Sequence, residues 1–462
     1  MSFLTNKYVK FGIAAVLYFL WVLWVGSYWL LIGLVVIYDI YITKKVNWTP
    51  WKKRDKKNHT VVEWIDALIF AVVAVTLINI FFFQNYKIPT PSMEKTLLVG
   101  DHLYVTKLKY GPKLPNTPIA FPFTQNTLPL TTGVKSYLNW PNWSYKRLKG
   151  FTTVKNDDIV VFNFPEGDTV VIQNPASSYY AILRSIAGQF KENDVSNKSP
   201  LKTKDQYFTL ARQYVANQFE ITVRPVDRRD NYIKRCIAIP GDTLKIINSQ
   251  VYINSKPEKL YNGMQFKYEI KTNGSINPEV FDKLDISPDD VNKEDNNQYI
   301  IALTGENAEK LKKNNYVTSV ERILKPSGLY ADYIFPHDIR YPWNEDNFGP
   351  LWIPKKGATV KLTMDNISMY ERIISAYEGN LLELKGGVIY INGQQTTSYT
   401  FKMDYYFMMG DNRHDSADSR FWGFVPEDHI VGAPRFVWLS LDKNKSFLSK
   451  IRWKRMFLGA SK

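Results

Sequence analysis

One serine of this chain lies on backbone that suits a nucleophile. Pro89 and Pro91 precede Ser92 in the segment KIPTPSMEKTLLVGD (87–101), directly after a long apolar run. Proline lacks an N–H and keeps the preceding residue out of helical geometry, so stiff, extended backbone is expected at Ser92. Serine reacts when a base takes its proton, but His102 has no evident acidic partner and no G-x-S-x-G turn is present. The alternative is that Ser92 is only a linker residue.

A lysine that could serve as the base lies in DNYIKRCIAIPGD (230–242). The pattern predicts a strand, on which Lys234 and Arg235 point to opposite faces, so one of them meets the apolar side. Arginine cannot lose its proton there, whereas burial lowers the pKa of a lysine and makes its neutral form available. The alternative is that both cations extend to water along their aliphatic stems.

A third segment, MMGDNRHDSADSRFWGFVPEDHIVG (408–432), is dense in charge. Gly410 and Asp411 begin a turn. Ser416 could orient a lysine amine by a hydrogen bond. The spacing of the charged residues predicts a salt-bridge network that braces a loop, formed by Asp415, Asp418, Arg413 and Arg420. Taken alone, the segment also fits an ordinary charged loop before a strand.

Composition restricts the class of protein. The chain has 462 residues, 45% of them hydrophobic, which is enough for a folded core. Its formal charge of +15 suits an anionic partner. Without a zinc knuckle, helix-turn-helix or RNA-recognition signature, membrane lipid is favoured and no nucleic acid is expected. The single cysteine, Cys236, excludes an internal disulfide and suits a small buried residue, and the five histidines lack metal-ligand spacing, so no metal is predicted.

Two apolar regions predict membrane helices. Residues 62–84 are long enough to span a bilayer and carry acids only at the leading edge. Residues 11–42 fit a hairpin of two short helices or one long tilted helix, and they lack the cleavage site of a removable signal peptide. The short loop 44–59 is rich in lysine and arginine, which predicts that it is cytoplasmic and that the chain after about residue 85 lies outside.

After residue 100, short β-branched and aromatic runs alternate with turn residues, a pattern typical of a mainly-β domain. Residues 242–258 resemble residues 381–397, each reading strand, turn, strand. Segment 139–151 mixes aromatic and cationic residues and suits either a lipid-facing patch or a surface loop. The predicted order is a hydrophobic segment (1–43), a basic cytoplasmic loop (44–61), a transmembrane helix (62–85), a catalytic β-domain in two parts (86–258 and 341–462) and an inserted lobe (259–340).

Together, these segments resemble one family, the type I signal peptidases or leader peptidases. The order is a transmembrane helix, P-x-S-M, D-D-I-V-V-F, Y-I-K-R-x-x-x-x-P-G-D and G-D-N-R-x-x-S-x-D-S-R-x-W-G-x-V-P. The last box is highly specific, although the boxes cover a minority of the chain. The hydrophobic N-terminal region and the long insertions resemble the larger Bacteroidetes-type members.

The resemblance implies a Ser–Lys serine protease that needs no cofactor. By motif, Ser92 is the nucleophile, Lys234 the general base, and Thr90 with the Ser92 N–H the oxyanion hole. It also implies that Ser416 orients the lysine and that three residues brace the last box, Asp411, Asp418 and Arg420. The small substrate pockets would be lined by Ile88, Pro89, Tyr232 and Ile233. Two departures are threonine at the often-serine oxyanion position and Lys95 where the family has a proline.

The implied activity is removal of N-terminal signal peptides from exported preproteins. The implied location is the bacterial inner membrane, with several spans and a periplasmic catalytic domain. The alternative is a membrane-tethered β-domain that binds or scaffolds exported peptides without catalysis. A self-cleaving Ser–Lys repressor is disfavoured by the membrane spans, and a processor dedicated to one exported protein stays open.

Overall fold

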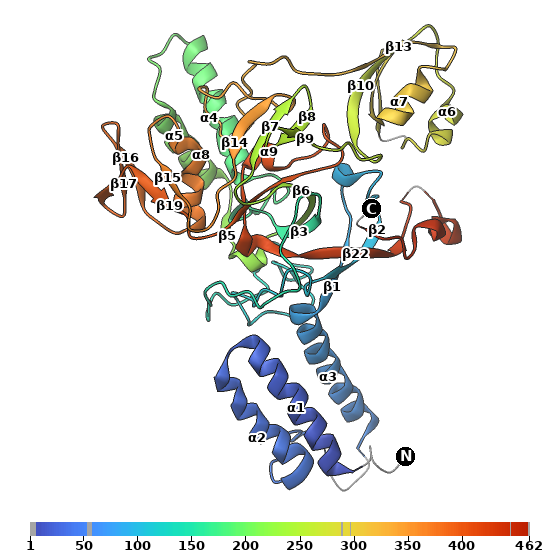
Figure 1. Ribbon diagram of the computed structural model, residues 1–462, viewed down its shortest axis with the longest axis vertical. Helices are drawn as coiled ribbons and strands as arrows, with labels where there is room; N and C mark the ends of the chain where they lie inside the picture. Colours follow the sequence, from blue (N-terminus) through green and yellow to red (C-terminus); the bar gives the residue numbers. More distant parts are fainter. Residues whose placement is uncertain (1–5, 53–57, 288–289, 296, 444, 461–462) are drawn as a thin grey trace.

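The computed structural model describes residues 6–52, 58–287, 290–295, 297–443 and 445–460. The basic stretch 53–57 of the predicted cytoplasmic loop therefore lies outside the described residues. In Figure 1, the N-terminal helices form one end of the molecule and the β-rich remainder forms the other.

The N-terminal apolar region is a helical hairpin rather than one long helix. Helix α1 (Lys7–Val25) ends at Gly26, whose φ of 65° reverses the chain, and a returning segment includes α2 (Gly33–Tyr38). The Tyr18 hydroxyl donates to the Leu30 carbonyl at 2.7 Å, which ties the two arms together. Helix α3 (Thr60–Phe81) follows beside them (Figure 1). Within the described ranges, α1 and α3 are the two helices long and apolar enough to cross a membrane.

The central sheet positions the three motif segments. Its strand order is β1-β2-β22-β3-β6-β20-β21, and the neighbouring strands are antiparallel. The strands are β1 (Phe83–Lys87), β2 (Asp101–Thr106), β22 (Ile430–Ser440), β3 (Ile159–Asn163), β6 (Asn231–Ala238), β20 (Tyr405–Met409) and β21 (Val425–Pro426). Strand β1 continues directly from α3, so the apolar helix fixes the sheet edge from which the serine segment leaves (Figure 1).

Two small sheets contain the hairpins that look alike in sequence. Strands β7 (Thr243–Ile247), β8 (Gln250–Ile253) and β9 (Lys256–Pro257) pair in sequence, with β14 (Phe348–Trp352) on the other side of β7. Strands β16 (Leu382–Lys385), β17 (Val388–Ile391) and β18 (Gln394–Gln395) repeat the arrangement. The short pair β15 (Thr359–Lys361) and β19 (Ser398–Thr400) and helix α8 (Ile367–Arg372) complete this region.

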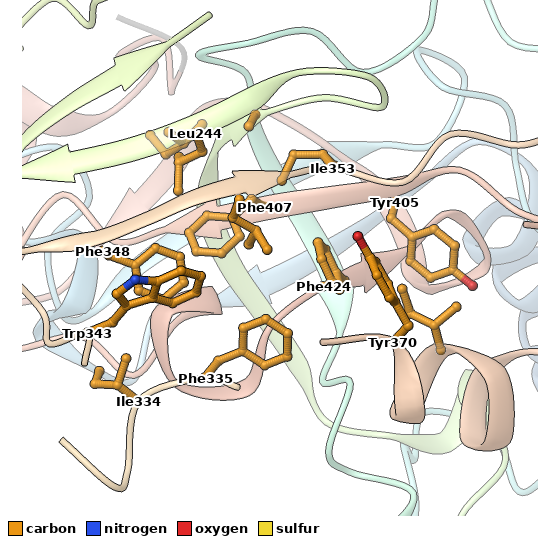
Figure 2. Close-up of a cluster of buried hydrophobic side chains, with 14 of the residues drawn as sticks. Leu244, Ile334, Phe335, Trp343, Phe348, Ile353, Tyr370, Tyr405, Phe407 and Phe424 are labelled. Carbon is orange, nitrogen blue, oxygen red and sulfur yellow. The ribbon is translucent and has the colours of Figure 1, made fainter. Parts of the chain in front are cut away.

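A large aromatic core lies under these sheets. In Figure 2, the Phe348 ring is tilted against both Trp343 and Phe407, with centroid distances of 4.6 and 5.5 Å. Phe335, Phe424 and Tyr405 continue the cluster. Phe407 lies on β20, so the core fixes the strand that leads into the charged motif 410–420. Aromatic side chains bury large areas, and their packing supplies a rigid base for that loop.

Two further units extend from the sheet (Figure 1). Helices α4 (Tyr179–Ser196) and α5 (Lys204–Gln218), which the sequence interpretation missed, pack on each other next to β4 (Thr169–Val171) and β5 (Ile221–Val223). The other unit, here called the β10–β13 unit, has the strand order β11-β12-β10-β13 and its own hydrophobic cluster. Its elements are β10 (Gln265–Thr272), α6 (Pro278–Lys283), β11 (Val291–Asp295), β12 (Gln298–Thr304), α7 (Gly305–Leu311) and β13 (Val317–Arg322).

Candidate active site

Ser92 and Lys234 are in direct contact. Ser92 lies in a single 3₁₀ turn, Pro91–Met93, after extended backbone at Thr90. The Lys234 Nζ and the Ser92 Oγ share a short hydrogen bond, although 142 positions separate them in sequence. The side chain of Lys234 comes from β6, where its backbone partner on β3 is Val160. The sheet thus joins the two groups that the sequence offered as nucleophile and base.

The environment of Lys234 favours its neutral form. The residue is only 3% exposed, and this burial lowers its pKa from 10.5 to about 8. The carboxylates of Asp418 and Asp411 act in the opposite direction and raise that pKa. The Tyr232 ring lies on the same face of β6, with its centroid 5.9 Å from the Nζ. A group with a pKa of about 8 is neutral in about one molecule in ten at pH 7, against about one in three thousand at 10.5.

Arg235, next to Lys234 in sequence, is buried as well. The expectation that one cation faces an apolar side is therefore incomplete, and the alternative that both reach water is wrong. Arg235 donates two hydrogen bonds to Asp411, at 2.8 and 2.7 Å, and its guanidinium stacks 4.1 Å from the Tyr261 ring centroid. The Asp411 carboxylate compensates the permanent charge of the buried Arg235 guanidinium. Lys234, in contrast, bonds to the neutral hydroxyl of Ser92.

The charged motif forms two buried carboxylate–guanidinium pairs. Asp411 also accepts from the Thr96 hydroxyl at 2.6 Å, which links this loop to the segment that follows Ser92. Asp418 accepts two hydrogen bonds from the Arg420 guanidinium, at 2.9 and 2.8 Å. It also accepts from the backbone N–H groups of Arg420 and Gly410, at 3.2 and 3.1 Å. Burial acts to raise the pKa of Asp418, but the guanidinium and the Gly410 N–H hold it below its ordinary value. Both pairs are suited to fix the loop beside Lys234.

Ser92 is also held through its backbone. The Asn412 N–H donates to the Ser92 carbonyl at 3.1 Å. A Cβ on Gly410 would lie 2.5 Å from that carbonyl and 2.3 Å from the Ser416 hydroxyl, so only glycine fits between them. Ser416 therefore lies close to the serine segment, while its recorded hydrogen bond goes to the Ala417 carbonyl at 3.5 Å. Its role in orienting Lys234 stays a prediction.

Thr90 is placed to act beside Ser92. It is exposed, and its hydroxyl lies 3.4 Å from the Ser92 hydroxyl. Lys95, at the position where the resemblance expects proline, has a φ of 68°. Proline is restricted to a φ near −65°, so this chain closes the turn in a conformation that excludes proline.

The expected pocket residues are divided among three surroundings. Ile88 is buried in one hydrophobic cluster, against which Ile233 packs. Tyr232 packs against a second cluster and stacks on Phe164 at 4.5 Å. Pro89 is exposed, and with Pro91 it lines a cavity of about 670 Å³. The other lining residues are Glu94, Leu98, Val99, Asp282, Asp285, Ile286, Ser287, Asp290, Asp415, Asp442, Lys443, Lys445 and Arg452.

The remaining candidate groups do not join this site through recorded contacts. His102 lies on β2 opposite Lys87, and its Nε2 lacks a hydrogen-bond partner among the described residues. Cys236 is a fully buried free thiol, as predicted. Within the described ranges, no group of three or more His, Cys, Asp or Glu side chains is placed to hold a metal ion.

Comparison with known proteins identifies the family. The family model described as "Signal peptidase, peptidase S26" matches residues 61–318 and 398–439, more than half of the chain. The chain belongs to this signal peptidase family. The match begins with α3 and includes both Ser92 and Lys234, together with the charged motif after β20.

Individual relatives of this signal peptidase support the same family assignment. Signal peptidase I of Buchnera aphidicola subsp. Acyrthosiphon pisum is 24% identical over 434 residues, covering 91% of this chain and 90% of the relative. That of Buchnera aphidicola subsp. Baizongia pistaciae is 21% identical over 398 residues, covering 84% and 80%. Signal peptidase I of Haemophilus influenzae is 46% identical over 66 residues, covering 14% and 19%.

Sequence reasoning gave no supporting role to three residues that hold the site, although Arg235 was considered as a cation that could face the apolar side. Thr96, Asn412 and Arg235 make the hydrogen bonds described above. The Arg235 and Thr96 side chains bond to Asp411, which lies 176 and 315 positions away in sequence. No local pattern could reveal partners at such separations.

Proposed function

We propose that this signal peptidase removes N-terminal signal peptides from exported preproteins with Ser92 as nucleophile and neutral Lys234 as general base. The observation that carries the proposal is the Nζ–Oγ contact of a buried lysine whose pKa is about 8. A base with a pKa near the working pH is the most effective proton acceptor.

The proposed reaction begins when the Ser92 Oγ attacks the scissile carbonyl carbon and its proton passes to the Lys234 Nζ. The negative charge that develops on the carbonyl oxygen is stabilised by the Ser92 N–H and the Thr90 hydroxyl. Each such donor contributes about 3 kcal/mol to transition-state stabilisation. The resulting ammonium of Lys234 then gives its proton to the departing amine, and a water molecule, deprotonated by the same lysine, hydrolyses the acyl-enzyme.

The surface beside Ser92 suits an extended peptide. β1 lies at the edge of the central sheet, and the chain continues from it through exposed Pro89 and Thr90 to the serine. An extended substrate can add itself to such an edge by main-chain hydrogen bonds. We propose that Ile88 and Ile233 limit the adjacent pockets to small side chains, since both pack into the same apolar cluster.

We also propose that α1, its returning arm and α3 span the inner membrane, with the loop 44–59 in the cytoplasm. A loop around residues 112–151 supports placing the β-rich domain next to the membrane, because it packs on the C-terminal ends of α1 and α3. The Trp24 Nε1 donates to the Lys149 carbonyl at 3.1 Å, and Leu148 packs against the helix cluster. Trp140 and Phe151 on this loop are more than 80% exposed, as expected for side chains at a lipid surface.

The catalytic proposal is tested by mapping the product. A purified preprotein is incubated in detergent with wild type and with Ser92→Ala, and the new N-terminus is determined by mass spectrometry. We expect a single cut after a small residue with wild type and no cut with Ser92→Ala. Tight preprotein binding without any cleavage by folded wild type would favour the non-catalytic binding domain instead.

The topology is tested with single cysteines. Cys236 is fully buried and should not react, so an impermeant maleimide reports on added sites alone. Exposed Asn47 and Asn139 are each changed to cysteine. In intact spheroplasts we expect labelling of Asn139→Cys, and of Asn47→Cys only after lysis. The reverse pattern would contradict the proposed orientation.

A further inference from the structure

The β10–β13 unit is bonded directly to the charged motif beside Lys234. Gln265, the first residue of β10, donates its N–H to the Asp411 carbonyl at 2.9 Å. Its own carbonyl accepts from the Arg413 N–H, also at 2.9 Å. Between these two bonds, the Asn412 N–H donates to the Ser92 carbonyl. The serine backbone, the charged loop and β10 therefore form one continuous hydrogen-bonded series.

His414 provides a second connection. Its Nδ1 accepts from the Lys267 N–H at 3.0 Å, so the ring proton is assigned to Nε2, which lies 2.7 Å from an Asp346 carboxylate oxygen. Asp346 in turn accepts from the Lys325 N–H and the Ser249 hydroxyl. The His414 side chain is 10% exposed. It thus joins β10 to the segment before β14.

The same unit also contacts the segment that follows Ser92. Lys95 forms an ion pair with Asp285 at 3.2 Å. A Cβ on Gly263, just before β10, would lie 2.8 Å from the Thr96 hydroxyl oxygen. Since that hydroxyl donates to Asp411, the unit touches both loops that bound the Ser92–Lys234 contact.

We propose that the β10–β13 unit positions the Ser–Lys pair, with His414 as a positioning residue that acts through the loop Gly410–Ser416. The inference rests on the proposed catalytic roles of Ser92 and Lys234. A displacement of about 1 Å at a reacting group can cost about a hundredfold in rate, so a loop held from two sides matters for turnover. Loss of the His414 bond to β10 loosens the loop and changes the surroundings of Lys234.

The test compares three variants of His414 in the full-length protein. Asparagine places a carbonyl oxygen near the position of Nδ1 and can still accept from the Lys267 N–H. Glutamine extends to the position of Nε2 and keeps a donor for Asp346, and alanine loses both bonds. We expect His414→Asn to stay within about twofold of wild type in kcat, while His414→Gln and His414→Ala fall about fivefold, the factor for one net hydrogen bond.

Three further measurements separate positioning from a general loss of structure. KM for the preprotein should change by less than about twofold, since no recorded His414 contact lies in the expected substrate pockets. The midpoint of the pH–kcat profile should shift in His414→Gln and His414→Ala but not in His414→Asn. Hydrogen–deuterium exchange of a peptide covering 405–423 should quicken in the same two variants, and circular dichroism should show all three folded.

Equal kcat in all three variants and wild type, with unchanged exchange, would overturn the inference. So would an equal loss in all three, since that would implicate the ring rather than its bond to β10. The exchange measurement does not depend on activity. If wild type cleaves nothing, the catalytic proposal fails by itself, and unchanged exchange in His414→Ala remains the result that rejects the positioning role.

Discussion

Replacement of Lys234 by methionine is expected to abolish activity and yet stabilise the fold at neutral pH. Burial lowers the pKa of Lys234 from 10.5 in the unfolded chain to about 8. Below pH 8, both states bind the proton and the full cost of burying the ammonium is present. Between pH 8 and 10.5, only the unfolded chain holds the proton, so the stability of wild type rises with pH across this interval.

The magnitude follows from the two pKa values. At about 1.4 kcal/mol for each pH unit, the difference corresponds to about 3 kcal/mol of lost stability at pH 7. Methionine has a similar shape and no charge, but it loses the hydrogen bond to Ser92, worth about 1 kcal/mol. Lys234→Met should therefore gain about 2 kcal/mol at pH 7, and this gain should fall to about zero by pH 10.

The assay is thermal unfolding in detergent, followed by circular dichroism at pH 7 and pH 10. Lys245→Met is the matched control, because Lys245 is exposed on β7, the next strand along the chain. We expect a Tm increase of a few degrees for Lys234→Met at pH 7 and none at pH 10, with a pH-independent effect for the control. A lower Tm for Lys234→Met at pH 7 would refute the account of a lysine destabilised by burial.

Three further outcomes concern activity. The kcat of wild type should rise with pH around a midpoint of about 8. Asp415→Asn should move this midpoint to lower pH, because the Asp415 carboxylate raises the pKa of Lys234. An unmoved midpoint would contradict this electrostatic role. If the Thr90 hydroxyl donates to the oxyanion, Thr90→Val should lower kcat about a hundredfold, while Thr90→Ser stays within a few-fold of wild type. Equal rates in both variants would exclude the Thr90 hydroxyl as a donor. Gly410→Ala should lower kcat strongly, whereas Gly305→Ala, with open space around its added methyl, should not. Normal preprotein cleavage by Gly410→Ala would show that the close approach of Gly410 to the Ser92 carbonyl is unimportant.

The chemistry of the site was largely readable from the sequence. Ser92 and Lys234 were each singled out from local residues as candidates, and the family resemblance implied their roles. The structure brings the two side chains into contact. Local sequence could not show what surrounds them. Arg235 is buried because Asp411, far along the chain, pairs with it, whereas the strand pattern alone predicted only that one of the two cations meets the apolar side.

Two features of the fold illustrate the same limit. The helical pair α4–α5 was missed although Ile182, Ile186 and Phe190 recur at helical spacing, and these side chains pack against its core. The choice between one long N-terminal helix and a hairpin was decided by Gly26, which ends α1 in a left-handed conformation. The length of the apolar run fitted both arrangements, so the sequence alone did not decide between them.

The most direct test of the central claim is a double-mutant cycle on preprotein cleavage with Ser92→Ala, Lys234→Ala and the double variant. Nucleophile and base act as one unit, so each single change should lower kcat/KM by about a thousandfold or more, and the double change should lower it no further. Circular dichroism must show that all three variants are folded. Near wild-type cleavage by Lys234→Ala, or losses that multiply in the double variant, would contradict the claim that Lys234 activates Ser92.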